Sequence, residues 1–328
     1  IVYHATIGSD VLIAKEACEI GRNVANKLWN AARFLVMNVS NASGSEDYEH
    51  DIFDKWIVSR YNHAAKSYIH ALEGYKINEA SKALYDFVWS EFCDWYIEIL
   101  KVKAVHNPKS SGKIFGDAIN LFESALKLLH PVMPFITEEL WSGLKEGRDG
   151  KSISVTDMPV VNESLILTDV EENISGIQNL ISAIRNLRAE VNLSPSVKCE
   201  VTISCSSIKD NEVLNSVTEY VLSLAKIEKA NIGTNLPKPE YKSISSVVSG
   251  YQVYLKIEGI VDVEKEKERT KKEIERAEGF LISINKKLEN EKFVSKASPE
   301  VVENEKKKQA DTMVKLEKLK HHYDSLVN

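Results

Sequence analysis

The sequence predicts a mainly α-helical protein. An antiparallel helical bundle comes first, then a small α+β unit, and a C-terminal antiparallel coiled-coil hairpin ends the chain. Three observations support this fold class. Apolar residues recur at helical spacing through the N-terminal part, short alternating runs appear only after Gly147, and the end of the chain is rich in Lys and Glu. We expect three domains, with boundaries at residues 1–146, 147–259 and 260–328.

The predicted bundle begins with a helix that contains Arg22–Phe34, in which Val24, Leu28, Ala31 and Leu35 fall on one side. The Gly- and Ser-containing segment Asn41–Asp47 separates it from the next helix by composition. Further helices are predicted over residues 52–72, 77–105 and 114–129, with a last one resuming at 137–141 after Pro131 and Pro134.

The middle of the chain changes in pattern at residues 147–159. Alternating runs predict strands at residues 198–204, 243–249 and 253–257, and helical spacing predicts helices at residues 171–190 and 211–225. Strands interspersed with helices over about a hundred residues are typical of a small α+β unit.

The C-terminal segment predicts two long helices that pack along one seam. On the first, apolar residues follow a three-four spacing from Val263 to Leu288, and on the second they recur at Val302, Leu316, Leu319, Tyr323 and Leu326. A break of about ten residues separates the two helices, which predicts an antiparallel hairpin with its tip near residues 290–299.

Composition narrows the class of protein. The formal net charge of −6 argues against a protein that coats nucleic acid non-specifically, although it leaves room for a local basic face. The four cysteines show no CxxC spacing, so we expect free thiols in a reducing compartment. No apolar run approaches the roughly 18 residues that a membrane span needs. We therefore expect a cytoplasmic protein, and the initial Ile1 suggests a piece of a longer one.

The first helix carries a polar strip almost opposite its apolar face. Guanidinium groups suit phosphates, carboxamides suit base edges, and a neighbouring aromatic ring suits base stacking. Both Trp29 and Phe34 flank the strip, and the sequence leaves open whether each faces the core or a ligand. A bundle helix with one solvated face is the alternative interpretation. The strip consists of Arg22, Asn26, Asn30 and Arg33, with Asn23 and Lys27 beside it.

Several stretches together resemble class Ia aminoacyl-tRNA synthetases, and in particular the valyl-tRNA synthetase family. The bundle motifs are RNVANKLWNAARF (22–34), NEASKALYDFVWSEFCDWYIE (78–98) and LLHPVMPFITEELW (128–141). The motif IRNLRAEVNLSPS (184–196) resembles the linker unit of the family. The stretches at 257–278 and 290–306 resemble the C-terminal coiled-coil arm of the bacterial-type valyl enzymes. The resemblance covers nearly the whole chain in the order of the family's C-terminal portion.

The resemblance implies that the bundle binds the anticodon loop of valine tRNA and that the arm binds the tRNA body. The HIGH and KMSKS signatures of the family, and its catalytic and editing domains, are not found in this sequence. The resemblance therefore implies no catalysis and no cofactor in this chain, with ATP and Mg²⁺ used by the absent catalytic domain. It implies a monomer that binds neither DNA nor membrane. The expected anticodon-binding residues are Arg22, Asn26, Lys27, Asn30, Arg33 and Phe34, and the expected arm residues are Lys286, Lys287, Lys292 and Lys296.

Two other classes of function remain as alternatives. A helical bundle with a coiled-coil hairpin is also suited to a structural or protein-interaction module without an RNA role. An independent enzyme is less consistent with the sequence, because His63 and His70 lie in no metal-binding or triad-like pattern. The acidic pair Glu138-Glu139 is interpreted as charge on a helix surface.

Overall fold

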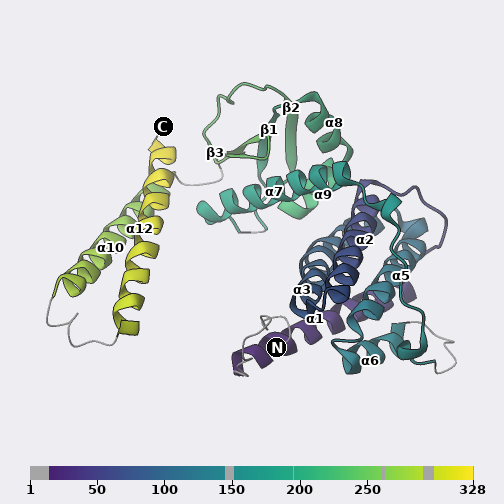
Figure 1. The fold of residues 1–328 in the computed structure, drawn as a ribbon. Coiled ribbons are helices and arrows are strands. Elements are labelled where there is room, and N and C mark those ends of the chain that lie inside the picture. Colours follow the sequence, from purple (N-terminus) through teal and green to yellow (C-terminus); the bar gives the residue numbers. More distant parts are fainter. Residues whose placement is uncertain (1–14, 145–150, 195, 260–262, 291–298, 328) are drawn as a thin grey trace. The chain divides into compact units, whose positions relative to one another are not determined.

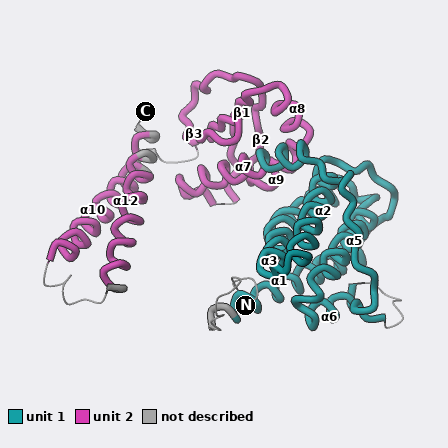
Figure 2. The backbone as a smooth tube through the Cα atoms, in the orientation of Figure 1, with its two compact units in different colours: residues 1–177 teal, residues 178–328 magenta. Residues whose placement is uncertain are grey.

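A computed structural model describes residues 15–144, 151–194, 196–259, 263–290 and 299–327 (Figure 1). The chain divides into two compact units, residues 1–177 and 178–328 (Figure 2). Mostly helical content, one small mixed sheet and a C-terminal helical hairpin confirm the predicted fold class. The three predicted domains remain a prediction, because the boundary between the two units falls inside one helix, α7 (Thr168–Glu190).

The bundle of the first unit runs up and down through long helices, close to the predicted spans. One close contact places the C-terminal end of α1 beside the N-terminal end of α5. The Gly112 amide at the start of α5 donates to the Gly44 carbonyl after α1 (2.8 Å), and a Cβ on Gly44 would lie 2.3 Å from the Lys109 carbonyl oxygen, so this approach requires glycine. The helices are α1 (Lys15–Ser40), α2 (Ile52–Glu73), α3 (Ile77–Asp86), α4 (Ile97–His106), α5 (Ser111–Leu129) and α6 (Pro134–Leu144).

Helices α3 and α4 are joined without a loop by η2 (Phe87–Tyr96), a segment with π-helical hydrogen bonding. At its end the Ile97 amide donates to the Phe92 carbonyl, five residues back, where an α-helix would use a residue four back. The sequence predicted one continuous helix over this stretch, and the change in hydrogen-bond spacing was not foreseen. Segments of this kind are frequent at functional sites.

The bundle core contains aromatic and aliphatic side chains from every long helix. Leu28, Ala31 and Leu35 of α1 are buried, and Val24 is half-buried, which confirms the predicted apolar face. One ion pair lies inside this core. The Lys103 ammonium is buried, lies 2.9 Å from Asp51 and contacts the buried Asp54, which compensates its charge.

Residues 151–167 belong to the first unit, although the sequence assigned them to the middle domain. The Trp141 indole donates to the Lys151 carbonyl (3.1 Å), and Ile153 is buried. Two short 3₁₀ turns, η4 (Ile153–Val155) and η5 (Glu163–Leu165), lie in this segment. At its end the Leu167 amide donates to the Ser59 hydroxyl of α2 (2.7 Å). The segment is therefore fixed along the bundle surface.

The second unit contains a four-stranded sheet with the order β2-β1-β4-β3. Strand β1 pairs in parallel with β2 and antiparallel with β4, while β3 pairs antiparallel with β4. The strand β2 was not predicted, because its sequence KANIGT has neither an apolar run nor a clear alternation. The elements are β1 (Glu200–Cys205), α8 (Ile208–Ser216), α9 (Thr218–Ala225), β2 (Lys229–Thr234), β3 (Ser243–Val248) and β4 (Tyr251–Lys256).

One buried arginine holds the start of this unit together. Arg188 of α7 donates to the carbonyl oxygens of Ser194 (2.7 Å), Val197 (3.1 Å) and Lys226 (2.6 Å). It also donates to the Cys199 sulfur at 2.7 Å. A buried guanidinium with this many acceptors is structural, so Arg188 serves folding within this motif.

The hairpin consists of α10 (Val263–Glu289) and α12 (Pro299–Val327), which pack along one another as predicted. Ala277, Ile284 and Leu316 are buried in the seam. Polar residues also occupy the seam, which the apolar pattern did not predict. Thr270, Glu305 and Thr312 are buried, and the Gln309 amide donates to the Asn285 carbonyl oxygen (2.8 Å).

A candidate nucleic-acid interface

The polar strip of α1 lies on the surface of the bundle. Helical geometry places Arg22, Asn26, Asn30 and Arg33 within about one quarter of the helix circumference, and all four are exposed. Neither Arg22 nor Arg33 forms an ion pair with any residue that the structure describes. The strip therefore offers two guanidinium groups, unpaired among the described residues, and two carboxamides on one face.

Lys27 lies beside this strip but is already paired. Its ammonium is 2.6 Å from the Asp94 carboxylate of η2 and 3.7 Å from the centroid of the Trp89 ring. Trp89 in turn stacks on Tyr85, with 5.6 Å between ring centroids. A Lys27 contact to phosphate would compete with Asp94, a partner 67 residues away that the sequence could not identify.

The two aromatics that flank the strip differ in their surroundings. Phe34 is half-buried and meets the Phe115 ring of α5 edge-on, with the centroids 5.8 Å apart. The Lys101 ammonium lies 5.4 Å from the Phe34 ring. Trp29 is 46% exposed. The structure thus places part of Phe34 in the helix packing and leaves much of the Trp29 ring open to solvent.

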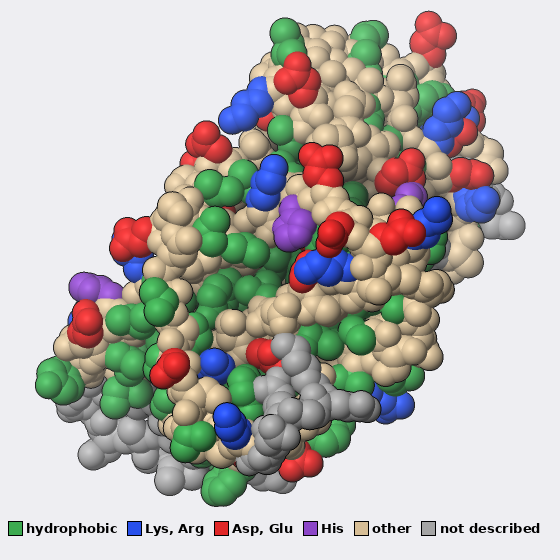
Figure 3. Space-filling model, turned by 90° about the vertical axis from the view of Figure 1, so that its right-hand side faces the viewer, with side chains coloured by type: hydrophobic (Ala, Val, Ile, Leu, Met, Phe, Trp, Pro, Cys, Tyr) green, Lys and Arg blue, Asp and Glu red, His purple; other side chains and the backbone are tan. Residues whose placement is uncertain are grey.

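Many lysines of the bundle surface are compensated by nearby carboxylates, whereas Arg22 and Arg33 of α1 pair with no carboxylate that the structure describes. On the face of the molecule drawn in Figure 3, basic and acidic side chains are interspersed and apolar side chains reach the surface between them. The paired lysines in the described part of the first unit include Lys27, Lys66, Lys76, Lys82, Lys101 and Lys113.

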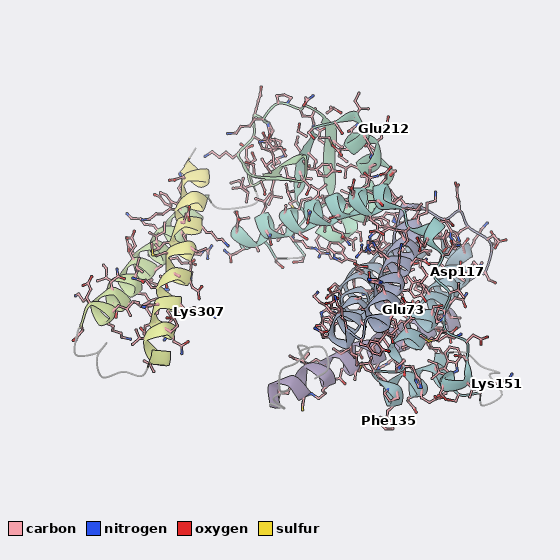
Figure 4. The ribbon with its side chains drawn as sticks, viewed as in Figure 1. Glu73, Asp117, Phe135, Lys151, Glu212 and Lys307 are labelled. Atoms are coloured by element: carbon pink, nitrogen blue, oxygen red, sulfur yellow. The ribbon has the colours of Figure 1, made fainter. Side chains whose placement is uncertain are left out.

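The predicted arm residues fall into three groups. Lys286 is exposed and has no ion pair with a described residue, whereas Lys287 lies 3.5 Å from the Glu305 carboxylate. Lys292 and Lys296 lie outside the described residues. Lys306 and Lys307 on α12 are also exposed, and Figure 4 labels the second of them.

Several side chains of catalytic type in the first unit have structural or unreactive surroundings. Glu138 accepts hydrogen bonds from the Ser152 hydroxyl (2.6 Å) and the Ile153 amide (3.4 Å), which gives it a structural task. Burial raises the pKa of Cys93 to about 12, so this thiol is protonated at neutral pH. His63 contacts Glu171 at 3.4 Å, within a network that joins α2 to α7.

The described residues contain no group of three or more His, Cys, Asp and Glu side chains arranged to hold a metal ion. None of the described helices combines the length and apolar character that a membrane crossing needs.

Two parts of the chain match known protein families. Residues 54–203 match the family model described as the anticodon-binding domain of tRNA ligase. Residues 262–326 match the model described as the valyl tRNA synthetase tRNA binding arm. The bundle and the hairpin are thus the domains of a class of tRNA ligase. The residues of the α1 strip precede the matched part of the first model.

Individual relatives identify the family. The chain is 34% identical over 333 residues to valine–tRNA ligase of Fusobacterium nucleatum, covering 99% of this chain and 37% of the relative. It is 37% identical over 304 residues to the ligase of Clostridium perfringens, covering 92% and 34%. The Chlorobaculum tepidum ligase is 33% identical over 341 residues, covering 99% and 38%. The chain belongs to the valyl-tRNA synthetase family and spans little more than a third of the length of these relatives.

Proposed function

We propose that this chain is the tRNA-recognition portion of a valine–tRNA ligase. The observation that carries the proposal is the exposed polar strip on α1, whose guanidinium groups pair with no described residue, in a bundle that matches tRNA-ligase anticodon-binding domains from residue 54 on. The anticodon loop presents unpaired bases, which amide groups and aromatic rings bind without opening a helix. Arg22 and Arg33 take phosphates, Asn26 and Asn30 take base edges, and Lys27 and Phe34 border the same surface.

The hairpin contributes contacts to the tRNA body. Lys286 supplies one exposed ammonium on α10, with Lys287 beside it, and the prediction extends to Lys292 and Lys296 near the tip. Lysine side chains meet phosphates as point charges, so these contacts raise affinity without reading sequence. The chain binds tRNA as a monomer, in the cytoplasm where tRNA is found.

The valine specificity and the chemistry belong to the proposal for the whole ligase. ATP, Mg²⁺ and valine are handled by the part of the relatives that this chain does not span, and this chain needs no cofactor of its own. Contacts along the tRNA hold its acceptor end in a productive orientation at that distant centre. DNA and membranes are not partners.

Binding to tRNA transcripts tests the proposal directly. We expect the chain to bind a valine tRNA transcript more tightly than the same transcript with a changed anticodon, with an affinity that falls steeply as salt rises. Titrations at several salt concentrations, followed by fluorescence anisotropy, measure both effects. Equal affinity for every RNA would contradict anticodon recognition. No binding at any salt concentration would favour the alternative, a protein-interaction module.

A further inference from the structure

The π-helical segment η2 brings two side chains together that an α-helix would separate. Trp89 and Asp94 are five residues apart. In an α-helix this spacing turns one residue about 140° away from the other. Because hydrogen bonds in η2 connect residues five apart, Trp89 and Asp94 lie close to one turn from each other. Both reach the same ammonium group of α1, that of Lys27.

These three residues form what we call the Lys27 clamp. Asp94 accepts from the Lys27 ammonium at 2.6 Å, and the Trp89 ring centroid is 3.7 Å from it. Tyr85 stacks on Trp89 with an interplanar angle of 11°, which supports the ring. The Lys27 side chain is 22% exposed and that of Asp94 is 53% exposed, so the clamp lies at the surface with its carboxylate facing solvent.

The position of the clamp matters because it borders the polar strip. Lys27 is three residues from Asn30, so the two lie on adjoining sectors of α1. Arg22 and Arg33 on the strip have no ion pair in the described part of the chain, whereas the charge of Lys27 is compensated. One cation next to the strip has thus been neutralised by a residue from another helix.

We propose that Asp94 is a specificity-determining residue for RNA, because it keeps Lys27 from acting as a general phosphate contact. The inference rests on the proposed function of the α1 strip. An RNA backbone that meets this surface in an arbitrary register finds the Lys27 charge cancelled and a carboxylate that repels phosphate. An RNA that is already held by base contacts to Asn26 and Asn30 brings one phosphate to a fixed position. There the Lys27 ammonium donates to the phosphate in addition to Asp94. Asp94 therefore lowers the affinity for unrelated RNA more than for the correct tRNA.

The substitution Asp94→Asn tests the proposal in the intact chain, with a valine tRNA transcript and an unrelated single-stranded RNA as probes. We expect the affinity for unrelated RNA to rise about two- to five-fold, and its salt slope to steepen by about 0.7, because one more cation becomes available. The affinity for valine tRNA rises less, so discrimination falls. Adding Lys27→Gln removes the gain. Glu163→Gln is the matched control, because it releases Lys66 from an exposed 2.8 Å ion pair on α2, away from α1.

Several outcomes would overturn the proposal. Weaker binding of both RNAs by Asp94→Asn would show that Asp94 holds Lys27 productively for all RNA. A gain that survives Lys27→Gln, or that Glu163→Gln reproduces, would show a general charge effect. Failure of the proposed function has a different signature, since the unmodified chain would then bind neither RNA or bind both with equal affinity.

Masking of Lys27 is measured separately by reductive methylation and mass spectrometry. We expect Lys27 to react more slowly than Lys55, an exposed lysine without an ion pair to a described residue, and to accelerate selectively in Asp94→Asn. An unchanged Lys27 rate in that variant would remove the physical basis of the proposal, whatever the RNA titrations show.

Discussion

Arg33 illustrates how much of the site follows from single residues. Its place on a polar strip was predicted from spacing alone, and the structure leaves it exposed without an ion pair among the described residues. The sequence could not predict which cations are compensated, because the partners lie far along the chain. Lys27 and Asp94 are 67 residues apart, and Lys103 and Asp54 are 49 apart. Only the packing of helices brings such groups together.

Replacing Arg33 with Ala separates recognition from folding. We expect weaker binding of valine tRNA, by about three- to ten-fold, and a salt slope that is smaller by about one, because one phosphate contact is lost. The melting temperature should stay nearly unchanged, since an exposed side chain without an ion pair contributes little to stability. Titrations at several salt concentrations and thermal denaturation measure the two quantities.

Lys55→Ala is the control for Arg33→Ala, because Lys55 is an exposed cation on α2 without an ion pair to a described residue. It should leave tRNA binding unchanged. A large fall in melting temperature on Arg33→Ala would instead assign that residue a structural role.

Individual helices show where apolar periodicity is sufficient to predict an element and where it is not. Apolar spacing predicted the spans of α2 and α5 to within a few residues, because each buries one stripe against its neighbours. It did not predict η2, since a π-helical segment uses the same residue types as an α-helix and differs in its hydrogen bonds. It also missed the polar part of the hairpin seam, where Glu305 is buried and accepts from Lys308 at 2.7 Å. A charged residue at a seam position is indistinguishable in sequence from a surface residue.

The lysines of α10 lead to a prediction about the hairpin as an element. We expect Lys286→Glu to weaken binding of valine tRNA more than Lys287→Glu does, because the Lys287 charge is shared with Glu305 at 3.5 Å. Both variants should lower the salt slope, and Lys286→Glu should lower it more. Binding titrations at several salt concentrations measure the slopes, and circular dichroism checks that the hairpin stays helical. Equal and unaltered slopes in both variants would argue against the arm as a phosphate contact.

At the scale of the whole molecule, the units differ in how well the sequence predicts them. The bundle and the hairpin follow from spacing, and the resemblance of long motifs predicted the family that the comparisons show. The α+β unit was predicted in outline, without β2 and without the interruption of its helix at Val217, where φ is −121°. Composition and spacing contain no direct signal for such a break. The placement of residues 151–167 on the bundle depends on hydrogen bonds that only the folded chain forms.

The whole chain should bind tRNA without performing chemistry on it. We expect no valine-dependent exchange of pyrophosphate into ATP, because the proposal assigns amino-acid activation to the part of the ligase relatives that this chain does not span. The exchange of radiolabelled pyrophosphate into ATP measures this, with the intact Fusobacterium nucleatum ligase as the positive control. Valine-dependent exchange by the purified chain would place the activating residues within these 328 residues.

The π-helical segment η2 also determines which loss of length this helix tolerates. Its wide turn holds one residue more than an α-helical turn, so deleting the exposed Ser90 would return the segment toward an α-helical repeat and leave the helix after it in nearly the same rotation. Trp89 and Asp94 would then be four residues apart and still share a face, and Lys103 would keep its carboxylate partners. A deletion in α4 before Lys103 has no wide turn to absorb it and would rotate Lys103 by about 100°, which would separate buried charges.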